Sequence, residues 1–206
     1  MSELSRKDLL RSLLGFVRQL SGEASTGEPA REERFVRPPG ALSPDEAYLA
    51  ACTGCEACVP ACPPGAIFLA KVGEGGRRVA VLDPARTPCR LCPDFPCIAA
   101  CQPGALAPLP APDAVRLGVA RVDPRFCRTF RGQACRVCVL VCPFPERAIR
   151  LVNARPVVEC EACTGCGLCA AACPDRPRAI VIHPERSLMP GSRWPVLVAP
   201  EGGLLG

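Results

Sequence analysis

Residues 52–63 run CTGCEACVPACP, and residues 163–174 run CTGCGLCAAACP. Both stretches hold four cysteines at the spacing C-x2-C-x2-C-x3-C, and a proline follows the last cysteine directly. Such tight spacing brings several thiolates to one point, as a metal centre requires. The two stretches therefore predict two metal-binding loops with the same local structure.

Two further groups of four cysteines, with less regular gaps, lie between these stretches. Sixteen of the 17 cysteines thus fall into four groups of four, and Cys160 is left over. The regular spacing is typical of cysteines that ligate [4Fe–4S] clusters, so the sequence predicts four such clusters. In chain order the predicted iron ligands are Cys52, Cys55, Cys58 and Cys62; Cys89, Cys92, Cys97 and Cys101; Cys127, Cys135, Cys138 and Cys142; and Cys163, Cys166, Cys169 and Cys173.

Disulfides and zinc are the alternatives for so many cysteines. The odd number, the crowded gaps and the lack of a convincing secretory signal argue against a disulfide scaffold. Zinc sites would be expected as isolated fours, usually with a longer gap between two CxxC pairs. Both alternatives are therefore weaker than iron–sulfur ligation.

The composition points to a fold that depends on its cofactors. The 206 residues are 49% hydrophobic but only 4% aromatic, so a large conventional core is not expected and clusters would replace much of it. No apolar run is long enough for a transmembrane helix. The net charge of +5 comes mainly from arginines interleaved with acidic residues, which gives no basic stripe for nucleic acid.

The residues that flank the cysteine groups also repeat. Each group is followed by Ala-Ile or Ala-Leu, at residues 66–67, 105–106, 148–149 and 179–180, and after groups one, three and four a strand is expected there. Strand-like stretches precede groups two to four, at residues 79–82, 119–122 and 157–158. The repeated unit of strand, cysteine loop, short helix and strand predicts an α+β fold. We expect two ferredoxin-like modules built round four iron–sulfur clusters, with an N-terminal helix.

The fourth cysteine of each group is expected to ligate the other cluster of a pair, as in two-cluster ferredoxins. Groups one and four are regular and groups two and three are irregular. This symmetry predicts that group one pairs with group four and group two with group three, in two interleaved modules.

Cys160 stands three residues before Cys163 and could imitate the start of a motif. Only the frame that begins at Cys163 places Cys173 and Pro174 at the signature distance, and it leaves the small residues Gly165 and Gly167 inside the loop. Cys160 is therefore predicted not to be a ligand.

The predicted organisation has three parts: an amphipathic helix and linker over 1–34, a four-cluster domain over 35–186 and a tail over 187–206. The helix over residues 3–20 carries Leu9, Leu13, Phe16 and Leu20 on one face. It could dock on a membrane surface or a partner subunit, pack on the protein itself, or be a decayed export signal.

Several stretches resemble NapG/MauM-type polyferredoxins, over about residues 35–186. They are RPPGA at 37–41, the first cysteine group, residues 88–101, DAVRLGVA at 113–120 and CTGCG at 163–167. The resemblance implies four [4Fe–4S] clusters on the sixteen cysteines named above. Proteins of that type serve electron delivery toward periplasmic redox enzymes such as nitrate reductase, so a nitrate-reductase-type accessory ferredoxin is expected. The partner itself does not transfer, because many electron-transfer subunits share this cysteine framework.

Export is where the sequence departs from that family. Residues 5–11, SRKDLLR, have Arg-Lys where a twin-arginine signal has two arginines, and the apolar stretch behind them is short. We expect a cytoplasmic protein, with periplasmic export through a degenerate signal as the alternative.

The expected function is the transfer of single electrons to or from a redox enzyme partner. No nucleophile–base–acid set is visible, so the protein is predicted to be a carrier and not an enzyme. The expected partner is a redox protein or an oxidoreductase subunit. The alternatives are a maturation or interaction factor for a metalloenzyme, or the electron-transfer subunit of a larger oxidoreductase.

Overall fold

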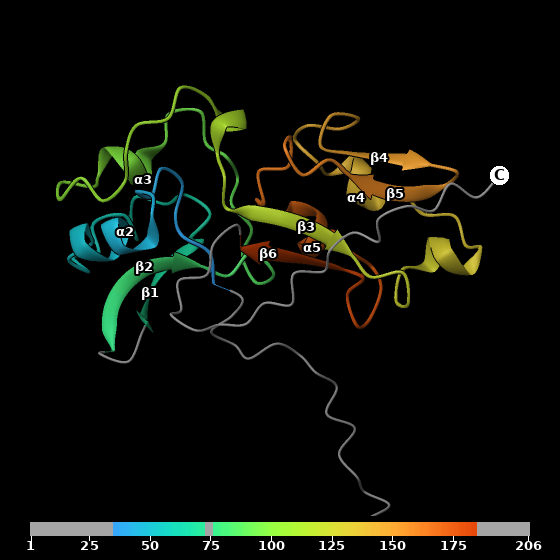
Figure 1. Cartoon of the computed structure of the whole chain (residues 1–206), viewed down its shortest axis with the longest axis horizontal. Coiled ribbons are helices and arrows are strands. Elements are labelled where there is room, and N and C mark those ends of the chain that lie inside the picture. Colours follow the sequence, from blue (N-terminus) through green and yellow to red (C-terminus); the bar gives the residue numbers. More distant parts are fainter. Residues whose placement is uncertain (1–34, 73–75, 185–206) are drawn as a thin grey trace, which may run out of the picture. The chain divides into compact units, whose positions relative to one another are not determined.

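A computed structural model describes residues 35–72 and 76–184 (Figure 1). The predicted N-terminal helix and the tail over 187–206 lie outside the described residues. Within them the fold is a small α+β structure of short helices and three two-stranded sheets. Its helices are α2 (Asp45–Ala51), α3 (Pro96–Ala99), α4 (Val137–Leu140), α5 (Leu168–Ala172) and the 3-10 turns η2 (Pro112–Ala114) and η3 (Arg128–Arg131). Its strands are β1 (Ile67–Val72), β2 (Arg77–Leu82), β3 (Gly118–Val122), β4 (Ile149–Val152), β5 (Arg155–Val158) and β6 (Ile180–Pro184).

The N-terminal half, residues 35–117, is built on the antiparallel hairpin of β1 and β2. Ile67 lies opposite Leu82, and the apolar residues of β2 are buried. A bridge between Val36 and Leu82 extends this hairpin by one residue pair. A second bridge joins Ala41, which precedes group one, to Leu106, which follows group two.

Helix α2 covers the hairpin and was not predicted from the sequence. It begins after Pro44 with Asp45 and Glu46 in its first turn, where carboxylates suit the positive end of the helix dipole. Tyr48 in this helix is fully buried, at 0% exposed, and its hydroxyl donates a 2.5 Å hydrogen bond to the Ala80 carbonyl oxygen of β2. This bond fixes the helix against the hairpin.

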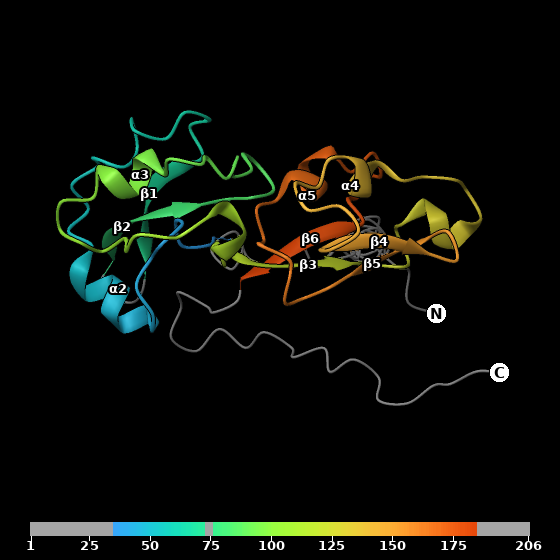
Figure 2. The ribbon, with the colours of Figure 1, turned by 90° about the horizontal axis from the view of Figure 1, so that it is seen from above.

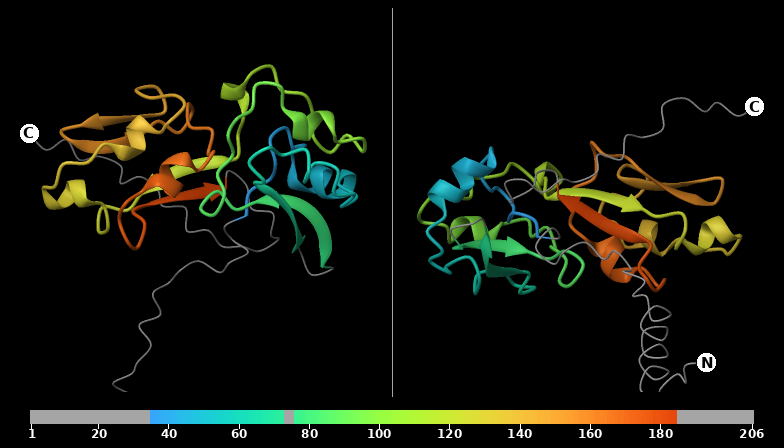
Figure 3. Two further views of the ribbon diagram at one scale, coloured as in Figure 1. Left: turned by 180° about the vertical axis from the view of Figure 1, so that it is seen from behind. Right: turned by 60° about the horizontal axis from the view of Figure 1, so that its bottom comes forward.

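The C-terminal half, residues 118–184, repeats the same plan with a longer outer pair of strands. β3, which precedes group three, pairs antiparallel with β6, which follows group four, from Gly118 opposite Pro184 to Val122 opposite Ile180. β4 and β5 form the inner hairpin. The outer pair lies side by side in every view (Figures 1, 2 and 3).

The strand predictions at 79–82, 119–122, 157–158 and 180–182 are confirmed, and strands also follow groups one and three as expected. The repeated alanines explain why, because all four are buried, together with the Ile or Leu that follows each of them. A small side chain lets the chain pass close to the cysteines before it enters the strand. The buried pairs are Ala66 and Ile67, Ala105 and Leu106, Ala148 and Ile149, and Ala179 and Ile180.

The predicted interleaving of the modules is wrong. Groups one and two lie in the N-terminal half and groups three and four in the C-terminal half, because each outer strand contact closes round two consecutive groups. The irregular gaps arise locally. The long gap of group three holds η3, and the widened gap of group two holds the left-handed residue Phe95 that starts α3. Irregular spacing therefore says nothing about which groups are neighbours.

No helix within residues 35–72 and 76–184 combines the length and the apolar character needed to cross a bilayer.

Candidate metal centres

The structure gathers the sixteen predicted ligands into four sets of four cysteines, which we name sites A to D. Each set takes three cysteines from one group and its fourth from the neighbouring group. Site A is Cys52, Cys55, Cys58 and Cys101; site B is Cys62, Cys89, Cys92 and Cys97; site C is Cys142, Cys163, Cys166 and Cys169; and site D is Cys127, Cys135, Cys138 and Cys173.

Sites A and B share the N-terminal half. Three cysteines of group one and Cys101 line one cavity, and three cysteines of group two and Cys62 line another. The fourth cysteine thus crosses to the neighbouring set, as expected for paired clusters. Because Cys62 lies with group two, the prediction that group one pairs with group four is wrong at the level of the ligands as well.

Sites C and D share the C-terminal half in the same crossed manner. Cys142 lines a cavity with three cysteines of group four. Cys173 packs with Cys127. Cys127 and Cys135 both lie close enough to Cys138 to raise its pKa, and Arg128 interacts with the charges of Cys135 and Cys173. Here the fourth cysteines of groups three and four exchange places.

Burial shapes the chemistry of these thiols. It raises the pKa of Cys89 to about 12 and the pKa of Cys58, Cys97 and Cys138 each to about 11. Neighbouring cysteines act in the same direction, because several thiolates in one apolar place repel each other. A cationic metal centre removes this conflict by taking the thiolates as ligands and releasing their protons.

Backbone amides point at the sulfurs. The Ala66 N–H donates to Cys62 Sγ at 3.3 Å, and the Ala120 N–H of β3 donates to Cys163 Sγ at 3.5 Å. Hydrogen bonds of this kind stabilise the anionic cluster and contribute to its reduction potential. The second bond also ties the outer strand of the C-terminal half to site C.

Sites B and C are joined by one hydrogen bond between two of their own cysteines. The backbone N–H of Cys89 donates to the backbone carbonyl oxygen of Cys166 at 2.9 Å. A second bond, from the Leu117 N–H to the Thr164 carbonyl oxygen at 2.9 Å, supports this contact. The loop of group four is therefore part of the contact between the halves.

Two glycines of this loop allow close approaches of the backbone, Gly165 to β3 of the same half and Gly167 to the other half. Gly165 has φ +69°, and a Cβ there would lie 2.4 Å from the Gly118 backbone; Gly167 has φ +90°, and a Cβ there would lie 2.5 Å from Pro84. The small residues were expected because the backbone approaches a cluster. The structure adds a further reason, which is the close approach of other chain segments.

Cys160 lies in the turn after β5 with its side chain exposed. It is not among the residues that line the site C cavity. That it is not a ligand stays a prediction. All 17 cysteines are free thiols, so no disulfide forms in this structure. In the described part of the chain, no group of three His, Cys, Asp or Glu side chains is placed to hold a single metal ion.

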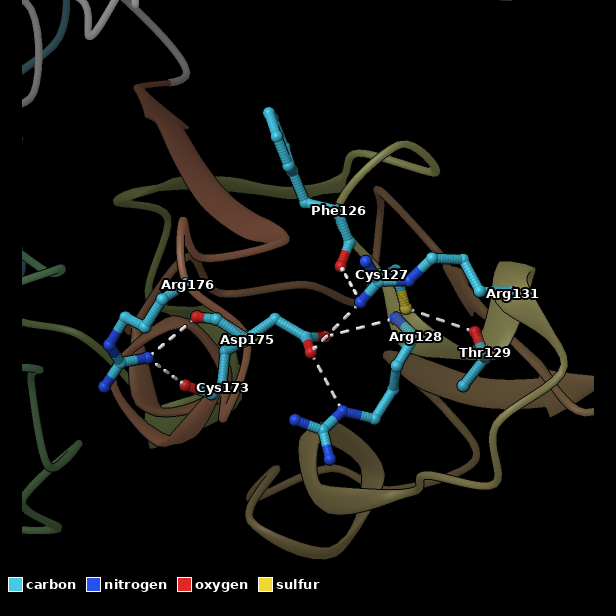
Figure 4. A network of polar contacts seen from close by, with 8 residues as sticks. All are labelled: Phe126, Cys127, Arg128, Thr129, Arg131, Cys173, Asp175 and Arg176. Atoms are coloured by element: carbon cyan, nitrogen blue, oxygen red, sulfur yellow. Dashed lines mark hydrogen bonds and ion pairs between the residues drawn. The ribbon is translucent and has the colours of Figure 1, made fainter.

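Site D has a polar surrounding that the sequence analysis missed (Figure 4). The Thr129 hydroxyl lies 3.1 Å from Cys127 Sγ. Asp175, only 7% exposed, accepts hydrogen bonds from the backbone N–H of Arg128 at 3.2 Å and from its Nε at 2.9 Å. No local pattern signals this network, because Asp175 lies 47 residues from Arg128 along the chain.

The residues present fit iron–sulfur clusters. Each site offers four cysteine sulfurs, sites A to C are lined mainly by apolar side chains, and backbone N–H groups face sulfurs at sites B and C. Four thiolates in an enclosed pocket with amide donors are what a [4Fe–4S] cluster requires. Fold and sites together define a small iron–sulfur protein of the ferredoxin type.

Comparison with known proteins agrees with this class. Residues 51–105 match a 4Fe-4S dicluster domain, and residues 161–176 match a 4Fe-4S binding domain. The methylamine utilization ferredoxin-type protein MauM of Paracoccus denitrificans is 38% identical over 84% of this chain and 80% of its own. The ferredoxin-type protein NapG of Escherichia coli is 37% identical over 84% of each chain, and that of Haemophilus influenzae is 39% identical over 75% of this chain and 61% of its own. No solved structure matches.

This chain belongs to the family of MauM- and NapG-type ferredoxin-type proteins, as the resemblance indicated. It is a 4Fe-4S electron-transfer protein, and members of this family are typically electron carriers and not catalysts.

Proposed function

We propose that the protein carries four [4Fe–4S] clusters, one in each of sites A to D, as two ferredoxin-like modules. When bound, each cluster accepts and releases a single electron. The cysteines hold the clusters in place while the charge changes, and the buried apolar lining keeps water away from them.

The observation that carries this proposal is the gathering of sixteen cysteines into four sets of four, and the bond from the Cys89 N–H to the Cys166 carbonyl oxygen joins two of these sets. Sites A and B are linked by group one, whose loop supplies Cys58 to site A and Cys62 to site B. Sites C and D are linked in the same way by group four, through Cys169 and Cys173. The bond between the halves completes a continuous series from A to D.

The partner in this proposal is a redox protein or an oxidoreductase subunit that exchanges single electrons with the series. The site of action is the cytoplasm, because the Arg6-Lys7 pair and the short apolar stretch behind it make a weak export signal. Fractionation of native cells, followed by identification of the proteins that co-purify, tests both statements.

Metal analysis tests the cluster load. Anaerobically purified protein is expected to contain about sixteen iron and sixteen sulfide per chain, from four clusters. A preparation that contains mainly zinc, or about eight iron, would contradict the proposal.

A further inference from the structure

The surroundings of site D differ from those of site A at the other end of the series. Thr129 lies next to Cys127, and its hydroxyl and the sulfur are 3.1 Å apart. Once Cys127 is a thiolate ligand it has no proton, so the threonine must be the donor. Thr53, beside Cys52 of site A, is exposed, whereas the buried Thr164 of site C bonds through its hydroxyl to Cys166. The hydroxyl contact therefore separates site D from site A, and it is positive charge that separates site D from site C, whose cavity is lined by no charged side chain.

Three arginines belong to this network, and two of them, Arg128 and Arg131, face its single carboxylate (Figure 4). Arg128 pairs with Asp175 at 2.9 Å and also lies near the sulfurs of Cys135 and Cys173. The other two are Arg131, 3.8 Å from the same carboxylate, and Arg176, which donates to the Cys173 carbonyl oxygen at 2.8 Å. Positive charge thus exceeds negative charge directly beside site D.

The wider sequence strengthens this imbalance. Residues 124–145, which supply three of the four site D cysteines, contain four arginines and no Asp or Glu. In the loop of site A the one charged residue, Glu56, pairs with Arg78. Residues 118–184 hold ten Lys or Arg against five Asp or Glu, whereas residues 35–117 hold seven of each.

Adding an electron to a cluster makes it more negative. Hydrogen bonds to sulfur and nearby positive charge stabilise that reduced state and raise the reduction potential. Given the four-cluster function proposed above, we infer that site D has the highest potential of the four and is the end of the series at which electrons collect. Thr129, Arg128 and Arg131 set this potential, and Asp175 limits it.

An electron that enters at site A therefore passes through B and C to D. With clusters held by the four cysteine sets, each transfer between neighbouring sites would remove one electron at one site and add it at the next, so electrons would balance within the chain. The acceptor that discharges site D is a one-electron redox centre of higher potential.

The test is an equilibrium reduction of the anaerobic holoprotein with dithionite, followed by EPR, on full-length variants whose iron content is measured first. Thr129→Val removes the hydroxyl and keeps the shape. The measured quantity is the ratio of reduced to oxidised protein for the cluster that is reduced first, at the potential where that cluster is half reduced in the wild-type protein. Thr129→Val is expected to lower this ratio about threefold to tenfold, because one hydrogen bond to a charged sulfur is lost. Thr53→Val is the matched control, and it should leave that ratio unchanged.

Asp175→Asn should shift the same step in the opposite direction, because it removes the negative charge and keeps an acceptor oxygen. Loss of packing would not produce shifts of opposite sign in these two variants. Arg131→Gln should lower the ratio, whereas Arg121→Gln, the same charge change on an exposed residue of β3, should not.

The inference is overturned if these variants move a later step of the titration, or move none. If Thr129→Val loses a cluster, the step that vanishes identifies site D: disappearance of the first step supports the inference, and disappearance of any other overturns it. Fewer than four clusters in the wild-type protein would instead contradict the proposed function, before any potential is compared.

Discussion

The loops of residues 52–63 and 163–174 share one cysteine spacing but face different surroundings. In the first loop Cys55 is exposed and the next residue, Glu56, points to solvent with φ +67°. In the second loop the equivalent Cys166 is 7% exposed, and Gly167 lies against Pro84 of the other half. The spacing determines the local loop in both places, and the residue after the second cysteine determines what can pack against it.

This comparison assigns different roles to the two loops. The loop of site A presents Cys55 at the surface. The loop of site C is closed to solvent and contacts site B through Cys166 and Cys89. The same motif therefore makes an external end in one half and an internal link in the other.

The largest effect is expected from exchanging the residues that follow the second cysteine of each loop, Glu56 and Gly167. Gly167→Glu places a Cβ 2.5 Å from Pro84 and a side chain in a left-handed conformation, at a cost of roughly 2–5 kcal/mol. We expect a clearly lower midpoint of anaerobic thermal unfolding and a loss of iron. Glu56→Gly, the reverse change in the solvent-facing loop, should leave both nearly unchanged. An unchanged midpoint in Gly167→Glu would contradict the contact between the halves.

Two cysteine variants test the register of the second loop. Cys163→Ser removes a cysteine of site C. Under the proposed four-cluster load, one cluster should be lost or converted and iron should fall from about sixteen toward about twelve per chain. Cys160→Ser should retain all the iron and all EPR signals, because Cys160 is exposed. The opposite result, with iron lost only in Cys160→Ser, would show that the ligand frame begins at Cys160.

Tyr48→Phe tests a stabilising feature of the N-terminal half. The ring of Tyr48 is fully buried, and its hydroxyl bonds to the Ala80 carbonyl oxygen. Removing this hydroxyl should lower the free energy of unfolding by about 1 kcal/mol. The thermal midpoint should fall by a few degrees, while the EPR signals of sites C and D stay the same. A change confined to the C-terminal sites would argue against the packing described for α2.

The smallest effect is expected at the ion pair beside site A. Glu56 and Arg78 are 2.9 Å apart, but both side chains are more than half exposed. Glu56→Gln should change the free energy of unfolding by less than about 0.5 kcal/mol. A larger change would mean that the solvent-facing loop is held more tightly than its exposure indicates.

The strands and the crossed fourth cysteines could be predicted because their signals are local. An Ala-Ile pair after groups one, three and four marks a small residue at a close approach and an apolar residue entering a strand. Helix α2 could also have been found, since Pro44 is followed by two carboxylates and an alanine-rich run.

The pairing predicted from regular spacing is wrong, because spacing carries no information on which groups lie close together. What brings groups together is the contact between the strand before one group and the strand after the next, as in Gly118 opposite Pro184. The carboxylate network at site D was missed for a related reason. Asp175 reaches Arg128 only after β3 and β6 have paired, so no short stretch of sequence contains both partners.

The crossed cysteines also fix the order in which a growing chain supplies each ligand set. Site B uses residues 62 to 97, which lie inside the span of site A, 52 to 101, and site C, 142 to 169, lies inside the span of site D, 127 to 173. As synthesis proceeds from the N-terminus, the ribosome releases the last cysteine of each inner set before that of the outer set. A nascent chain that ends at Leu117 already holds all eight thiols of its first half, so that half can receive iron while the second is still being made. Cys173 is the last of the sixteen cysteines to emerge, so site D is the last set to be completed.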